Sequence, residues 1–144
     1  MALLSPLPDA ARVWIHPATE PLSAETQNAL RKRLRDFVET WSSHNQAVEG
    51  GVATLHDRFV VLAGARTDGN DPSGCAIDDA THAVTEAAND LGIEWVPSLH
   101  VLYRTSGGDV AAVSRQTFQD RVEAGAVTTA TTVFDPSVTT LGAV

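Results

Sequence analysis

Cys75 is the only cysteine in the sequence and the residue best suited to nucleophilic or redox chemistry. It follows a polar, glycine-rich stretch and precedes a helical periodicity of apolar residues that ends near Leu91, so it lies at or just before a predicted helix N-terminus. Backbone N–H groups at such a terminus stabilise a thiolate. If the helix starts at Ser73 or Gly74, the thiol shares one side of the helix with three titratable residues. These are Asp79, His82 and Glu86.

The surroundings of Cys75 argue against a strongly activated thiol. Neighbouring carboxylates, Asp78 among them, carry negative charge that destabilises a thiolate. His82 lies two helical turns away, roughly 10 Å along the axis, which is too far for direct proton transfer. Two interpretations therefore stay open: an inert cysteine above a solvated acidic helix face, and a thiol-dependent enzyme or redox sensor. The candidate catalytic residues of that enzyme are Cys75, Asp78, His82 and His44.

Other catalytic and ligand-binding motifs are missing from the sequence. One cysteine and five scattered histidines form no Cys-x-x-Cys, His-x-x-x-His or His-Glu-x-x-His pattern, so a metal site would need residues from distant segments. Neither phosphate-binding glycine motif, G-x-x-x-x-G-K-[ST] or G-x-G-x-x-G, occurs, and G-x-S-x-G is also absent. We therefore expect no metal and no cofactor, and neither an NTPase nor a hydrolase with a nucleophile elbow.

Among the aromatic residues, Trp14 is the best candidate for a binding role. Residues 12–17 alternate as a strand with two unlike faces, on which Val13 and Ile15 oppose Arg12, Trp14 and His16. A tryptophan on the less apolar face is either exposed for binding or covered because both faces of the strand are buried. The sequence favours neither alternative.

The charge of the chain limits its partners. The 144 residues include 18 acidic and 10 basic side chains, which gives a formal net charge of −8. A field of this sign repels phosphate backbones and anionic lipid surfaces, so nucleic acid and membranes are poor partners. Nine of the basic residues are arginine and only Lys32 is lysine. A GC-rich genome or adaptation to high intracellular salt would each explain this composition, and we favour the second.

The compartment follows from cysteine usage and hydropathy. A single cysteine forms no internal disulfide, which suits a reducing environment. The N-terminus lacks the positive charge of a signal peptide, and the longest apolar run, residues 59–65, is too short to span a bilayer. We expect a cytoplasmic protein.

The predicted elements alternate between strands and helices. In chain order they are a strand at 12–17, a helix from the N-cap Ser23 to Trp41, a hairpin of strands at 52–55 and 59–63, a helix ending at Leu91, a hairpin of strands at 99–104 and 110–113, a helix at 115–124 and a strand at 128–134. The glycines of Glu49-Gly50-Gly51 are interpreted as a break before the first hairpin. The first six elements match the ferredoxin-like split βαβ arrangement, in which two helices cover one antiparallel sheet. We expect one α+β domain over residues 1–144 with a C-terminal strand-helix-strand extension, or else a differently ordered mixed sheet.

The first predicted helix carries a basic cluster. Arg31, Lys32, Arg33 and Arg35 lie close to Asp36 and Glu39, at spacings that allow ion pairs one turn apart. We interpret the cluster as a solvated, partly neutralised face and not as an anion site.

Several short runs resemble a group of small uncharacterised bacterial proteins, some of which carry the label of ABC-transporter ATPase. The runs are Ala11-Arg-Val-Trp-Ile15, Trp41-Ser-Ser-His44, Arg58-Phe-Val-Val-Leu62, Ser73-Gly-Cys-Ala-Ile-Asp78 and Thr131-Thr-Val-Phe-Asp135. The resemblance covers nearly the whole chain and implies a freestanding cytosolic protein. Its ATPase label does not carry over, because the Walker residues are missing here.

The C-terminal third has a second, local likeness. Residues 103–138 resemble GYF-like modules in their strand, helix and strand pattern with a Gly-Gly turn, although they lack the aromatic cluster with which those modules bind proline-rich peptides.

The leading hypothesis is a non-enzymatic binding or accessory domain that contacts a protein or small molecule near Trp14 and Cys75, with a homodimer as a further option. The candidate binding residues are Trp14, His16, Arg58 and Ser73.

Overall fold

The computed structural model describes residues 7–43, 46–66 and 74–144. The chain divides into a larger unit, Met1–Trp95 with Ser137–Val144, and a smaller unit, Val96–Pro136. The expected single domain over 1–144 stays a prediction. No helix in the described ranges has the length and hydropathy that a membrane span requires.

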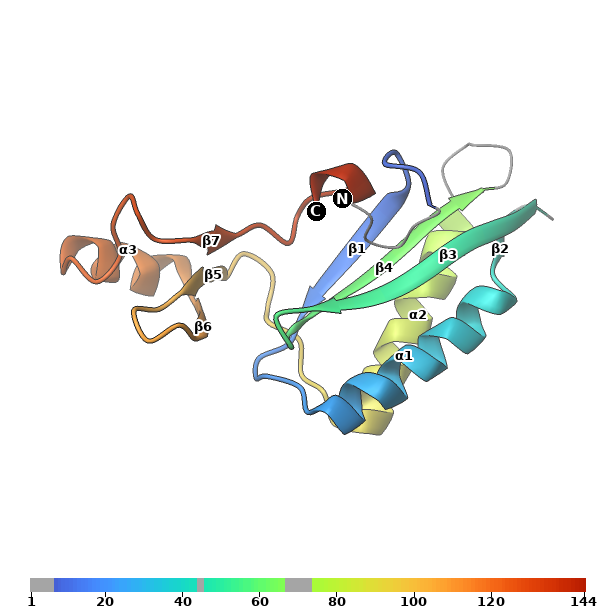
Figure 1. Cartoon of the computed structure of the whole chain (residues 1–144), viewed down its shortest axis with the longest axis horizontal. Coiled ribbons are helices and arrows are strands. Elements are labelled where there is room, and N and C mark those ends of the chain that lie inside the picture. The colour runs from blue at the N-terminus through green and yellow to red at the C-terminus, as the bar shows by residue number, and fades with distance from the viewer. Residues whose placement is uncertain (1–6, 44–45, 67–73) are drawn as a thin grey trace. The chain divides into compact units, whose positions relative to one another are not determined.

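The larger unit is an antiparallel sheet with two helices on one face (Figure 1). The strand order is β1-β4-β3-β2. Its elements are β1 (Arg12–Pro17), α1 (Ala24–Glu39), β2 (Ser42–Ser43), β3 (Gln46–Leu55), β4 (Phe59–Arg66), α2 (Gly74–Leu91) and the 3₁₀ helix η1 (Leu141–Ala143). The N-cap Ser23 and the positive φ of Gly92 place the helix ends where the sequence predicts them.

Trp41 organises the core between the helices and the sheet. Its side chain is 4% exposed, and its indole Nε1 donates a hydrogen bond to the carbonyl of Ala76 at 3.0 Å. The ring lies against the backbone of Gly64 and Gly50, where a Cβ atom would approach it to 2.4 Å and 3.1 Å. Gly50 therefore belongs to the interior of β3, and the expected break before the hairpin is wrong.

The opposite face of the sheet is also covered. Val13 and Val61 form a second buried cluster with Leu141 from the C-terminal segment. In Figure 1 this segment, with η1, lies across the sheet from the two helices. Both faces of β1 are therefore covered by other elements, which is the second of the two alternatives for this strand.

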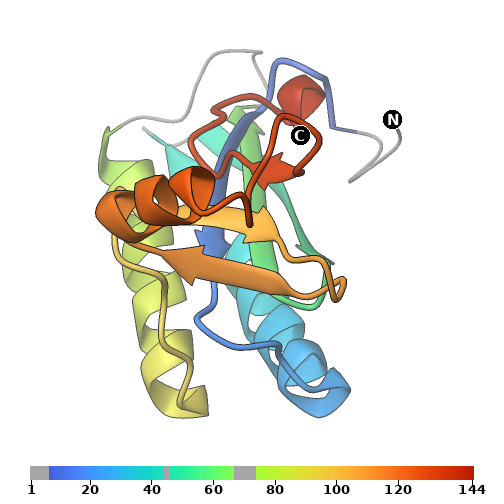
Figure 2. The same cartoon turned by 90° about the vertical axis from the view of Figure 1, so that its left-hand side faces the viewer.

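The smaller unit is a three-stranded antiparallel sheet with one helix (Figure 2). The order is β6-β5-β7, and the elements are β5 (Val101–Arg104), β6 (Val110–Val113), α3 (Arg115–Glu123) and β7 (Val133–Phe134). Phe118 of α3 packs on Tyr103 with ring centroids 5.6 Å apart, and Arg121 donates to the Tyr103 hydroxyl. The spacing of apolar residues in 115–124 predicts that Phe118 and Val122 form the buried side of α3, but Val122 is 46% exposed, so its predicted burial is wrong.

The α+β class is confirmed, but the ferredoxin-like split βαβ sheet is not found in the described residues. The predicted strand at 99–104 pairs with β6 and β7 in the smaller unit and does not join β1. Its hairpin closes over a short loop, with Thr105 N–H bonded to Asp109 O at 2.7 Å, and short loops have a low entropic cost. Arg12 of β1 instead forms a single bridge to Thr140, and Ala18, directly after β1, forms one to Trp95.

Candidate functional site

Cys75 lies exposed in the first turn of α2. Nothing in the described part of the chain forms a hydrogen bond with its thiol. The imidazole of His82 pairs with Glu86 one turn further along the helix, with Nε2 and Oε1 3.3 Å apart. Asp78 is exposed, whereas His44 and Ser73 lie outside the described residues. Across the described ranges, no group of three or more His, Cys, Asp or Glu side chains could hold a metal ion.

Trp14 and His16 lie half-buried on the helix-covered side of β1. Trp14 meets Trp41 edge-to-face, with ring centroids 6.0 Å apart, so it is not the exposed aromatic of the first alternative. The rings of His16 and Trp95 pack against each other, with their centroids 5.4 Å apart. Burial lowers the pKa of the His16 imidazole from its ordinary value of 6.5, because desolvation disfavours the charged form.

The buried His16 predicts a loss of stability in acid. Its pKa is lower in the folded than in the unfolded state, so the unfolded state binds the proton first as the pH falls below 6.5. The contribution of His16 to the free energy of unfolding is therefore fully present above pH 6.5. It declines as the pH falls from 6.5 to the pKa of the folded state. Urea unfolding of wild type and His16→Phe between pH 7.5 and 5 should show a weaker pH dependence in the variant. Equal slopes would contradict a buried neutral imidazole.

Arg58 is a buried structural residue in this fold. Only 6% of it is exposed, and Nε donates to the carbonyl of Ala18 at 3.2 Å while a terminal nitrogen donates to the carbonyl of Thr19. These bonds tie the start of β4 to the segment between β1 and α1. The geometry gives Arg58 a structural task, and its expected binding role stays a prediction.

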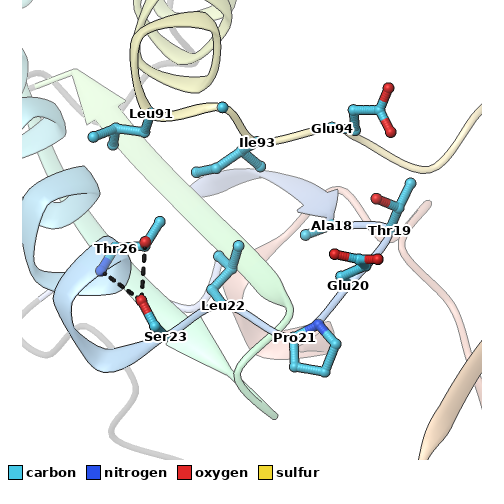
Figure 3. A pocket seen from close by; sticks show the side chains of 11 residues that line it. Ala18, Thr19, Glu20, Pro21, Leu22, Ser23, Thr26, Leu91, Ile93 and Glu94 are labelled. Carbon is cyan, nitrogen blue, oxygen red and sulfur yellow. Dashed lines mark hydrogen bonds between the residues drawn. The ribbon is translucent and has the colours of Figure 1, made fainter.

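One hollow lies between the β1–α1 connection and the segment that follows α2 (Figure 3). Its volume is about 430 Å³, and Leu22, Leu91 and Ile93 contribute apolar surface to it. The hydroxyl of Ser23 is already engaged as the N-cap of α1, since it accepts from the backbone N–H of Thr26 at 3.1 Å. This hydroxyl is therefore used by the fold.

A second hollow, which we name the α1–β3 groove, has a volume of about 620 Å³. Its walls come from the exposed side of α1 and the end of β3. The lining residues are Asn28, Arg31, Lys32, Arg35, Asp36, Glu39, Val52, Ala53 and Thr54.

The outer edge of β3 is unpaired along this groove among the described residues. β2 pairs only with the first two residues of β3, and the N–H of Val48 then donates to the carbonyl of Trp41 at 3.0 Å. From Val48 onward the β3–β4 register is continuous, and the backbone polar groups of successive strand residues alternate in direction. The N–H and C=O groups of Gly50, Val52 and Thr54 therefore point away from β4, and Val52 and Thr54 also line the groove.

A hydrogen-bond network fixes the end of the groove at the β3–β4 turn. Arg31 donates to the Thr54 hydroxyl at 3.0 Å, and this hydroxyl donates to the side-chain oxygen of Gln27 at 2.9 Å. The amide nitrogen of Gln27 donates to Asp57 at 3.0 Å. Asp57 and its neighbour His56 both have positive φ, as in a type I′ turn. The network holds Arg31 at the β3 edge.

The groove carries more positive than negative side chains. Lys32 pairs with Asp36 at 3.2 Å, with both side chains largely exposed. Arg33 bonds to Asp90 of α2 and does not line the groove. Arg35 lines the groove, is exposed, and forms neither an ion pair nor a hydrogen bond with any described residue. Within the described ranges, the site thus combines a strand edge that no other strand pairs with and a cation that has no ion-pair partner.

The sequence indicates the basic cluster of α1, as a run of cations on one helix, but it does not indicate the groove. The strand beside that run, and the freedom of its edge, depend on the order of strands in the sheet. The chain matches no protein-family model, no curated protein and no solved structure.

Proposed function

We propose that the protein is a non-enzymatic binding module whose α1–β3 groove takes an extended segment of a partner protein. The segment adds as a strand to the edge of β3. The edge at Gly50, Val52 and Thr54, which no residue in the described part of the chain pairs with, supports this proposal, because exposed N–H and C=O rows are templates for strand addition.

The free edge of β3 is long enough for one short strand. Four residue steps separate Gly50 from Thr54, which corresponds to about 13 Å of extended chain. An added strand lies about 4.8 Å from β3, and its alternate side chains would turn toward the wall that α1 provides. Main-chain bonds to β3 supply affinity, and the side chains of α1 supply selectivity.

The test uses three acetylated eight-residue peptides in which valine alternates with glutamate, glutamine or lysine. Amide chemical shifts of the ¹⁵N-labelled protein report where each peptide binds. We expect at least one peptide to shift the amides of residues 48–54 and of the groove-facing side of α1. Failure of all three peptides to bind at millimolar concentration would refute the proposal.

Two substitutions at Thr54 isolate the strand edge. Thr54→Val removes the hydroxyl and keeps the backbone N–H, whereas Thr54→Pro also removes the outward-pointing donor and leaves the bonds to β4 intact. We expect Thr54→Pro to bind the best peptide about tenfold more weakly than Thr54→Val, since one main-chain hydrogen bond and close approach are lost. Equal affinities would exclude strand addition at this edge. Cys75→Ser, on α2, should bind like wild type, and a loss of binding would favour the thiol alternative.

A further inference from the structure

We infer that the segment bound in the α1–β3 groove is acidic and that its carboxylates contact Arg35 and Arg31. This inference rests on the proposed function and names the chemistry of its ligand. The observation behind it is that Arg35, among the described residues, has no carboxylate or carbonyl partner although it lines the groove.

The spacing of the two arginines suits an extended ligand. Arg31 and Arg35 are four residues apart on α1, which is about 6 Å along a helix axis. Side chains on one face of a strand repeat every two residues, or about 6.7 Å. In Figure 1, α1 and β3 run alongside one another. A strand added to β3 would therefore present successive carboxylates to successive arginines.

Both arginines have donors to spare for a carboxylate. A guanidinium group carries five N–H donors. Arg31 uses some of them on the Thr54 hydroxyl and the side-chain oxygen of Asn28, which also fixes its position. Arg35 uses none within the described residues. Arginine is suited to this task because its planar donors bind a carboxylate in bidentate fashion.

The charge of the whole protein makes this groove selective. A net charge of −8 repels acidic chains elsewhere on the surface, so an acidic segment is accepted only where cations gather. Asp36 and Glu39 border the same groove, where their carboxylates repel an acidic ligand and attract basic side chains. Lys32 is partly neutralised by Asp36, which leaves Arg31 and Arg35 as the main cations.

The glutamate, glutamine and lysine peptides test the inference directly by fluorescence anisotropy. At 25 mM NaCl we expect the glutamate peptide to bind about tenfold more tightly than the glutamine peptide, and the lysine peptide to bind most weakly. At 300 mM NaCl the preference for glutamate should shrink, because these charges are partly exposed. If the glutamate and glutamine peptides bind with equal affinity and both shift the β3 amides, the inference of an acidic ligand is wrong, whereas the proposed function is supported.

Substitutions of two arginines on α1 provide a matched pair. Arg35→Gln should lower the affinity for the glutamate peptide about fivefold and leave the affinity for the glutamine peptide unchanged, because only the glutamate peptide loses an ion pair. Arg33→Gln removes the same charge outside the groove and should leave both affinities unchanged. Equal losses in the two variants would show a general field effect and would overturn the assignment to this groove. A glutamate peptide with alternate N-methylated amides that binds undiminished would show that no strand is added.

Discussion

Replacing Gly64 with alanine should lower the free energy of unfolding by about 3 kcal/mol, a large value for the addition of one methyl group. The new Cβ would lie 2.4 Å from Cη2 and Cζ3 of Trp41. The indole has little room to retreat, because it is bonded to the carbonyl of Ala76 and packed against Phe37 and Trp14. Either the sheet or the helices must therefore shift.

Urea unfolding of three variants checks this expectation. Gly74→Ala is the matched control, since a Cβ there meets nothing within 4 Å and alanine favours a helix. Its stability should equal or slightly exceed that of wild type. The double variant Gly64→Ala with Trp41→Leu should lose less stability than the sum of the single variants, because the smaller side chain relieves the overlap. An additive result, or a loss below about 0.5 kcal/mol for Gly64→Ala, would show that this contact is not tight.

Local chemistry allowed much of the secondary structure to be predicted. Ser23 and Ser114 cap α1 and α3 because a serine hydroxyl satisfies helical N–H groups within its own turn. Gly92 and Gly125 end α2 and α3 with positive φ for a similarly local reason. Gly50 was misinterpreted because its role depends on Trp41, a residue from outside its own strand.

Non-local pairing explains what the sequence did not predict. The sequence predicts the hairpin of 99–104 with 110–113, but nothing in it distinguishes β1 from β7 as the neighbour on the other edge of this strand. For the same reason the basic cluster of α1 had no assigned neighbour, and the free edge of β3 was not foreseen. The sequence indicates Cys75 because thiol chemistry depends on a single residue, whereas a groove is formed by two elements.

Replacing Arg58 with methionine should lower the free energy of unfolding by about 3 kcal/mol. Methionine keeps much of the apolar length of the side chain but has no donor for the carbonyls of Ala18 and Thr19. Those two acceptors hold the segment that leads into α1, so α1 loses part of its attachment to the sheet. Arg58→Lys should show a smaller loss, because one ammonium group reaches fewer acceptors.

The same variants separate a structural task from a binding task for Arg58. Exposed Arg115, in the smaller unit, serves as the control, and Arg115→Met should change stability by less than about 0.5 kcal/mol. Arg58 does not line the α1–β3 groove. Folded Arg58→Met, measured well below its unfolding transition, should therefore bind the glutamate peptide with wild-type affinity. A loss of affinity without a loss of stability would reverse this assignment and make Arg58 the binding residue that the sequence predicted.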